Sequence, residues 1–205
     1  MKPRYQLLSQ AELEQIHETT LRVMEEVGVV FSYDPARELL AKHGARVEGH
    51  TVFFPRALVE ERLKTVPSSF TLHARNPEKS VVMNTEDTYY AGPNCPPYIQ
   101  DLDNGRRYAT LNDFINIVKL VNDLPNVDIQ SQIPCEPNDV ETDMRPVMMT
   151  YNMLKYSDKP LMGSSLGYEF SKKSIEMAAI ANGGLDVLEE KTVIAAIPCT
   201  LTPLS

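Results

Sequence analysis

The sequence lacks several features that mark whole classes of protein. Its 205 residues contain no tryptophan, and no apolar run approaches the ~20 residues of a membrane span. Lys and Arg cluster no further than the pairs Arg106–Arg107 and Lys172–Lys173, and the net charge is −8. A nucleic-acid-binding surface needs a basic patch. We therefore expect neither a membrane-embedded protein nor a nucleic-acid partner.

Cysteine is also scarce. Cys95, Cys135 and Cys199 are odd in number and stand 40 and 64 residues apart, which suits neither a disulfide framework nor a clustered metal site. The N-terminal stretch MKPRYQLLSQAELEQ lacks the apolar core of a signal peptide. We therefore expect a protein of the reducing cytoplasm.

What the sequence does contain is a repeat in its second half. Three short apolar segments begin 33 residues apart, and the stretches between them have helical character: Val127–Pro134, Pro160–Leu166 and Val193–Thr200. Strands separated by whole helices run parallel, because the crossover is too long for a hairpin. The spacing predicts three β/α units with parallel strands, adjacent in that order.

These units predict an α/β protein of the barrel type. A closed eight-stranded (β/α)8 barrel, the TIM type, needs ~250 residues, and the predicted barrel begins only near residue 110. We therefore interpret residues 109–205 as the first three β/α units of an incomplete barrel, and the chain as the front part of a longer protein.

The first half predicts helices and hairpins. Ser9 with Glu12 forms a capping box, Gly28 ends the first helix, and Asp34 with Pro35 opens a second. Hairpins are predicted over Val47–Phe54 and where Phe70–Ala74 meets Val81–Met83. Residues 1–108 are thus expected to form an N-terminal helical and hairpin extension.

The least regular stretch runs from Tyr89 to Tyr108. Three prolines and one glycine between residues 92 and 97 disfavour both a helix and a regularly hydrogen-bonded strand. Asp103-Asn104-Gly105 predicts a tight turn. Thr110 with Asp113 then predicts the start of an amphipathic helix that ends near Pro125.

Several stretches, in order and spacing, resemble one family. They are LSQAELEQIHETTLRVMEEVGV followed by DPARELLAKHGA, then PSSFTLHARNPEKSV, DLDNGRRYATLNDF, SDKPL and a final PLS. The chain resembles the N-terminal part of the trimethylamine methyltransferase family, which includes non-pyrrolysine members that act on glycine betaine and similar quaternary amines.

The resemblance implies a barrel enzyme that moves a methyl group from a methylated amine to the Co(I) corrinoid of a partner protein. The corrinoid (cobalamin) is then carried by the partner, and no cofactor is bound directly. We also expect a homo-oligomer at full length. The position that holds pyrrolysine in the trimethylamine enzymes falls in the C-terminal half of the family, outside this chain.

A quaternary ammonium has no N–H, so aromatic faces and a nearby carboxylate are what can attract it; a cation–π contact contributes ~0.5–2 kcal/mol. Tyr89, Tyr90 and Tyr98 lie within ten residues of one another, and Asp101 follows. One interpretation is part of a cationic cage at the barrel mouth. The other is amphipathic packing for a Pro-rich loop, which we weigh more heavily.

In a barrel, catalytic groups stand at the carboxyl ends of the strands. Gln130 and Gln132 are expected on one strand face, as a pair of substrate-binding amides if that face points inward. Lys159 is expected to be structural, because it precedes its strand. The further candidates around the three strand ends are Glu136, Ser164, Ser165, Thr200 and Thr202.

Two alternatives stay open. Cys135 and Cys199 follow the first and third strands and could converge as a zinc thiolate pair, but a zinc site needs three or four ligands and no His is placed near them. Small buried thiols are the favoured interpretation. As for function, the alternative to a methyltransferase is a non-catalytic truncated fragment or paralogue that binds a quaternary amine or a partner.

Overall fold

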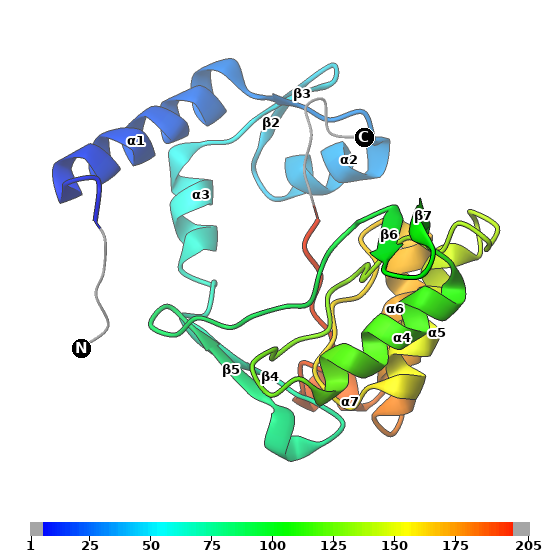
Figure 1. The fold of residues 1–205 in the computed structure, drawn as a ribbon. Coiled ribbons are helices and arrows are strands. Elements are labelled where there is room, and N and C mark those ends of the chain that lie inside the picture. The colour runs from blue at the N-terminus through cyan, green and yellow to red at the C-terminus, as the bar shows by residue number, and fades with distance from the viewer. Residues whose placement is uncertain (1–5, 199–205) are drawn as a thin grey trace. The chain divides into compact units, whose positions relative to one another are not determined.

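The computed structural model describes residues 6–198, which fall into two compact units (Figure 1). The first comprises the described residues up to Pro67, and the second begins at Ser68. Both mix helices with small sheets, and the described residues form no closed barrel. No helix in this part of the chain is both long and apolar enough to cross a membrane. The division into residues 1–108 and 109–205 stays a prediction.

The first unit consists of helices and a three-stranded antiparallel sheet of order β1-β3-β2. Its elements are α1 (Gln10–Arg22), a π-helical turn (Val23–Val27), β1 (Val29–Val30), α2 (Asp34–Lys42), β2 (Arg46–Glu48), β3 (Thr51–Phe53) and α3 (Arg56–Leu63). The hairpin predicted over Val47–Phe54 is confirmed by the pairing of Val47 with Val52.

Local sequence explains where these helices begin and end. The predicted capping box is present: Glu12 N–H donates to Ser9 Oγ, and Ser9 N–H donates to the Glu12 carboxylate. Gly28 ends the helical run with φ of 77°, and a Cβ there would lie 2.8 Å from the Val52 carbonyl oxygen. Asp34 and Pro35 open α2 as predicted, with Asp34 already helical and Tyr33 as the N-cap.

The second unit carries two antiparallel hairpins and four parallel chain segments. Its elements are β4 (Ser69–Leu72), a 3-10 turn (Pro77–Lys79), β5 (Val81–Asn84), β6 (Tyr98–Asp101), β7 (Gly105–Tyr108), α4 (Leu111–Asp123), α5 (Arg145–Tyr156), α6 (Tyr168–Ala181) and α7 (Val187–Glu190). Both the pairing of β4 with β5 and the turn that joins β6 to β7 were predicted and are confirmed.

The parallel order of the three repeated segments is confirmed as far as residue 198. Gln130 pairs with Leu161 and Met162 pairs with Ala195, both in parallel. Gln130 N–H donates to the Pro160 carbonyl at 2.8 Å, and Gly163 N–H donates to the Ala195 carbonyl at 2.7 Å. The pairing takes the form of isolated bridges rather than long ladders, so the array is open and irregular.

A fourth parallel segment, residues 90–95, was not predicted. Ala91 pairs in parallel with Ile129, and Cys95 N–H donates to the Ile133 carbonyl at 2.8 Å. The sequence did not indicate it, because its prolines cannot donate backbone hydrogen bonds to a neighbouring strand and interrupt the pattern expected of a strand. The parallel array therefore begins before the hairpin β6–β7 and not after it.

Two hydrophobic clusters lie on opposite faces of this array. The larger packs the array against α4 and α5, and its buried members are Ala109, Phe114, Val118, Ile133, Cys135, Met149, Met153, Leu154 and Leu161. Figure 1 shows α4, α5 and α6 side by side along that face. The smaller cluster joins Leu72 and Val81 of the β4–β5 hairpin to Ile129.

The β4–β5 hairpin covers the amino edge of the array. Leu72 pairs in parallel with Thr192, and His73 N–H donates to the Thr192 carbonyl at 2.8 Å. In the loop that joins its strands, Asn76 N–H donates to the Asp158 carbonyl at 3.2 Å, just before the segment that begins at Pro160. The amino edge is thus occupied by the protein's own chain.

Candidate functional site

The carboxyl edge of the parallel array brings together polar groups from three segments. Ile133 N–H donates to Asn94 Oδ1 at 3.2 Å, which ties the ends of the first two segments. Gln132 and Ser165 stand at the ends of the second and third. Side chains at the carboxyl ends of parallel strands converge on one edge, where α/β proteins bind their ligands. We therefore take this edge as the candidate site.

Gln132 and Ser165 form the direct contact within it. Gln132 Nε2 donates to Ser165 Oγ at 3.1 Å, and Ser165 Oγ lies 3.3 Å from Gln132 Oε1. Both residues are half-buried. An amide and a hydroxyl held together in this way offer neutral donors and acceptors without a fixed charge. The pair can therefore bind either a carboxylate or the polarised methyl groups of a cation.

Gln130 does not join this pair. It is fully buried, and its Nε2 donates to the Val118 carbonyl of α4 at 2.9 Å. The expectation that Gln130 and Gln132 share a face is wrong. Ile129 and Ile133 should share a face in a regular strand, yet they pack into different hydrophobic clusters, so the alternation breaks between them. A bend at Gln132 marks the break.

The structure places the three predicted cage tyrosines in separate surroundings. Tyr89 packs against the smaller cluster and donates its hydroxyl to the Val82 carbonyl at 2.7 Å. Tyr90 is exposed and lies at the amino end of its segment, where its N–H donates to Asp128 Oδ2 at 2.8 Å. Tyr98 follows the carboxyl end of the same segment. These contacts favour packing over a shared cage.

Tyr98 belongs to an aromatic stack on the β6–β7 hairpin. Its ring centroid is 4.7 Å from that of Tyr108, and the Arg106 guanidinium carbon lies 4.1 Å from the Tyr98 centroid. A guanidinium therefore already occupies one position that a quaternary ammonium would take on this ring.

Asp101 is used within the same hairpin. Its carboxylate accepts from Asn104 N–H at 2.7 Å and from Asp103 N–H at 3.0 Å, and it pairs with Arg107 at 3.2 Å. These contacts, with the Asn104 N–H foremost, lower the pKa of the Asp101 carboxyl. The carboxylate thus stabilises the turn between β6 and β7.

Ser164 and Glu136 have partners within the protein. Ser164 is buried, its N–H donates to Ser174 Oγ at 3.2 Å, and its own Oγ accepts from Leu166 N–H at 3.3 Å. Arg145 donates to Glu136 at 2.9 Å. Thr200 and Thr202 lie outside the described residues, and their proposed part in the site stays a prediction.

The Cys135 thiol is buried in the larger cluster, and burial raises its pKa to about 12. A protonated thiol is a poor metal ligand and a poor nucleophile. Its predicted partner Cys199 lies outside the described residues. Within residues 6–198, no three His, Cys, Asp or Glu side chains are grouped to hold a metal ion.

Cys95 and Asn94 were not predicted as parts of the site. Cys95 has φ of 62°, the one positive value among the described residues other than glycine. Such conformations concentrate at functional sites, since the surrounding structure must hold them. A positive φ leaves no mark in the sequence when the residue is not glycine, and the prolines around Cys95 suggested only a loop.

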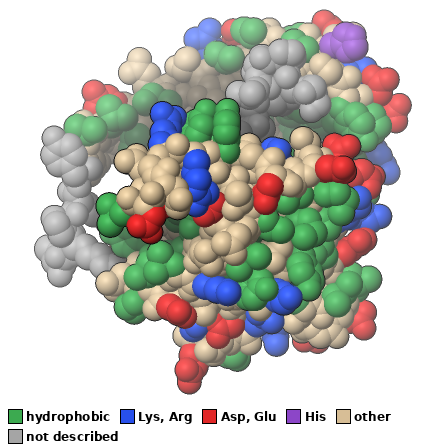
Figure 2. All heavy atoms as spheres, turned by 45° about the vertical axis from the view of Figure 1, so that its right-hand side comes forward, with side chains coloured by type: hydrophobic (Ala, Val, Ile, Leu, Met, Phe, Trp, Pro, Cys, Tyr) green, Lys and Arg blue, Asp and Glu red, His purple; other side chains and the backbone are tan. Residues whose placement is uncertain are grey.

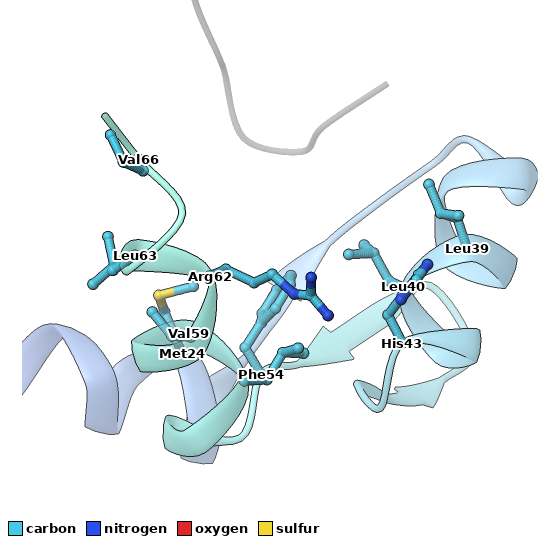
Figure 3. Close-up of a pocket in the computed structure, with 10 residues that line it drawn as sticks. Met24, Leu39, Leu40, His43, Phe54, Val59, Arg62, Leu63 and Val66 are labelled. Carbon is cyan, nitrogen blue, oxygen red and sulfur yellow. The ribbon is translucent and has the colours of Figure 1, made fainter. Parts of the chain in front are cut away.

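A cavity lies in the first unit (Figure 3). It has a volume of about 500 Å3 and is lined by Met24, Leu39, Leu40, His43, Phe54, Leu58, Val59, Arg62, Leu63 and Val66. Apart from the His43 imidazole and the Arg62 guanidinium, the side chains that line it are apolar. It offers a packing surface rather than a set of converging polar groups.

Comparison with known proteins decides the family. The family model described as trimethylamine methyltransferase matches residues 1–205. A glycine betaine methyltransferase of Desulfitobacterium hafniense (strain Y51) is 40% identical over 98% of the chain. The chain belongs to the trimethylamine methyltransferase family. The resemblance inferred from the sequence is confirmed.

Two further relatives share less identity with the chain. An L-carnitine:corrinoid methyltransferase and a proline betaine:corrinoid methyltransferase, both of Eubacterium limosum, are 28% and 27% identical over 94% and 96% of the chain. The chain spans about two-fifths of these curated relatives, 42% of the glycine betaine enzyme and 41% of the carnitine enzyme.

Proposed function

We propose that the protein to which this chain belongs transfers a methyl group from a zwitterionic quaternary amine, glycine betaine foremost, to the Co(I) corrinoid of a partner protein. The observation that carries this proposal is the 40% identity to a glycine betaine methyltransferase along nearly the whole chain. The corrinoid acts as the methyl acceptor and is a co-substrate carried by the partner.

The carboxyl edge of the array supports a zwitterionic substrate. Glycine betaine, carnitine and proline betaine each carry a carboxylate besides the quaternary nitrogen, whereas trimethylamine carries none. Gln132 and Ser165 are neutral donors, and their only described side-chain partners are each other. We propose that they release one another to donate to the substrate carboxylate, a contact of ~0.5–3 kcal/mol.

The reaction asks little of the protein in acid or base chemistry. The C–N bond breaks, its electron pair stays on nitrogen, and the methyl group bonds to the corrinoid cobalt. The departing tertiary amine is neutral, so no general acid is required. Binding and orientation are therefore what this chain would contribute. A complete barrel, a cytoplasmic location and a homo-oligomer remain predictions.

The test is methyl transfer by the full-length protein that contains this chain. With cob(I)alamin as acceptor, glycine betaine should yield dimethylglycine, followed by proton NMR, and trimethylamine should yield far less dimethylamine. Equal turnover of both amines would remove the carboxylate contact from the proposal. No turnover of any methylated amine, with either cob(I)alamin or a corrinoid protein, would remove the methyltransferase assignment and leave a binding protein.

A further inference from the structure

The β6–β7 hairpin presents an unusual outer surface. Tyr108 is 60% exposed, Tyr98 is 37% exposed, and Leu102 at the turn is fully exposed. Arg106, also exposed, lies over the Tyr98 ring. Tyrosine and arginine are the side chains most enriched at the energetic centres of protein interfaces. Three such residues, together with the exposed Leu102, on one hairpin mark a docking surface more than single exposed residues would.

The two arginines of this hairpin have different roles. Arg107 pairs with Asp101 at 3.2 Å and with Asp113 at 2.6 Å, so its charge is satisfied within the protein. Arg106 directly precedes Arg107 in the strand, so its side chain projects from the opposite face. Among residues 6–198, the guanidinium of Arg106 contacts the Tyr98 ring and pairs with no carboxylate. Its guanidinium is therefore available to an acidic group from outside.

The hairpin is held firmly at its base. The Pro97 carbonyl accepts from Ala109 N–H at 3.1 Å and from Asn138 Nδ2 at 3.1 Å. The Arg107–Asp113 pair fixes β7 to the first turn of α4. A surface held in place before it binds loses little conformational entropy on binding. The exposed side chains thus stand on a preorganised support.

The hairpin also stands where a methyl acceptor must arrive. The chain enters it directly after Cys95, whose N–H bonds to the Ile133 carbonyl at the carboxyl edge. The amino edge is covered by the β4–β5 hairpin. An acceptor must come within bonding distance of the substrate methyl group, so a protein that carries it must contact the rim of the carboxyl edge.

We propose that the outer face of the β6–β7 hairpin is a docking surface for the corrinoid-carrying partner protein, with Arg106 meeting an acidic side chain and Leu102 and Tyr108 supplying apolar contact. This inference rests on the proposed methyl-transfer function. The proposed occupant of the surface is a protein. The alternative, that Arg106 binds the small methylated amine, is tested in the same experiment.

The experiment compares two acceptors in the full-length enzyme. Arg106→Glu and Leu102→Ser should each raise the KM for a purified corrinoid protein about tenfold or more, and the KM of the wild-type enzyme for that protein should rise with salt. Turnover with free cob(I)alamin, and the KM for glycine betaine measured with it, should be unchanged. Matched controls on α6 are Lys173→Glu, whose cation lies over Phe170, and Ile180→Ser, which is 69% exposed.

Three results would overturn the docking surface. If the wild-type enzyme is active and both variants keep its KM for the corrinoid protein, the hairpin is not the docking surface. A raised KM for glycine betaine with free cob(I)alamin assigns Arg106 to the substrate instead. A wild-type enzyme that is inactive with both acceptors removes the proposed function, and the docking surface with it.

Discussion

At the scale of single residues, Lys159 has the clearest structural role. Its buried ammonium donates to the carbonyl oxygens of Val121, Leu124 and Val127 at 2.7, 2.6 and 2.5 Å. These carbonyls end α4 and begin the next parallel segment, where backbone acceptors otherwise lack donors. Burial, and the nearby Lys79 cation, lower the Lys159 pKa. The structural role predicted from its place before a strand is confirmed.

Lys159→Met keeps the aliphatic stem and removes the ammonium. The change should lower the free energy of unfolding by about 2–4 kcal/mol, since buried acceptors lose their donor. Urea denaturation of the full-length protein measures the loss. Lys172→Met, on the exposed face of α6, is the control and should change stability by less than about 0.5 kcal/mol. Equal stability of the two variants would contradict the capping role.

Gln132 carries the residue-scale prediction on function. Gln132→Glu would place a negative charge beside the proposed substrate carboxylate and should raise the KM for glycine betaine about tenfold, the equivalent of ~1.4 kcal/mol. Ser165→Ala, which removes one donor, should raise it about two- to tenfold. Steady-state kinetics with cob(I)alamin as acceptor decides. If Gln132→Glu leaves the KM for glycine betaine unchanged, the substrate carboxylate does not bind beside residue 132.

At the scale of elements, the joint between β7 and α4 combines a helix cap with an ion pair. Thr110 Oγ1 accepts from Asp113 N–H, and the Asp113 carboxylate accepts from Thr110 N–H at 2.8 Å. Arg107 donates to the same carboxylate. These contacts, Arg107 foremost, hold the pKa of Asp113 well below its usual range. The cap predicted from the sequence is confirmed. The hairpin adds a further partner for its carboxylate, Arg107 of β7.

The depressed pKa gives a pH dependence. A carboxyl with a lower pKa in the folded state contributes stability above its unfolded pKa of about 3.9, and loses it as the pH falls toward the folded value. Asp113→Asn should therefore destabilise the protein by about 1 kcal/mol at pH 7, and the difference from wild type should shrink below about pH 4. Urea unfolding from pH 7 to pH 3 would follow it. A constant difference would mean that the charge contributes nothing.

At the scale of the whole molecule, the parallel segment that begins at Val193 leaves apolar residues uncovered. Ala195 pairs with Met162 on one side, while on the other side the described pairing reaches only Thr192. Ile197 is 60% exposed. The sequence predicted an unprotected edge over Val193–Thr200; the β4–β5 hairpin covers its beginning, and residues 199 and 200 lie outside the described part.

Residues 1–205 produced alone should therefore self-associate, because an uncovered strand edge with apolar side chains can pair with another chain. Light scattering after size exclusion should show a mass that grows with concentration. Ile197→Lys, a charge on the edge, should reduce it, and Leu185→Lys, 57% exposed after α6, should not. A monodisperse, cooperatively folding 205-residue chain would contradict both the open edge and the interpretation of the chain as the front part of a longer protein.

The sequence by itself determined the local elements and the order of the parallel segments. Capping residues such as Ser9 and Thr110, and the turn at Asp103-Asn104-Gly105, act over a few residues, so their signals stand next to the structure they specify. The 33-residue repeat fixed the parallel order because a crossover of that length leaves little other choice. The family followed from the same stretches.

Only the tertiary structure decided which side chains meet. A bend at Gln132 separated it from Gln130, and prolines hid the segment at residues 90–95. The predicted cage tyrosines lie at opposite ends of that segment, where Tyr89 packs against the smaller cluster and Tyr98 stacks on Tyr108. Most of these partners lie outside the same helix or strand: Val118 is 12 residues from Gln130, Ala91 is 38 residues from Ile129, and Ser165 is 33 residues from Gln132. The alternation of side chains predicts which residues share a face only while the strand stays regular. Here the strand bends at Gln132, the residue that contacts Ser165 in the candidate site.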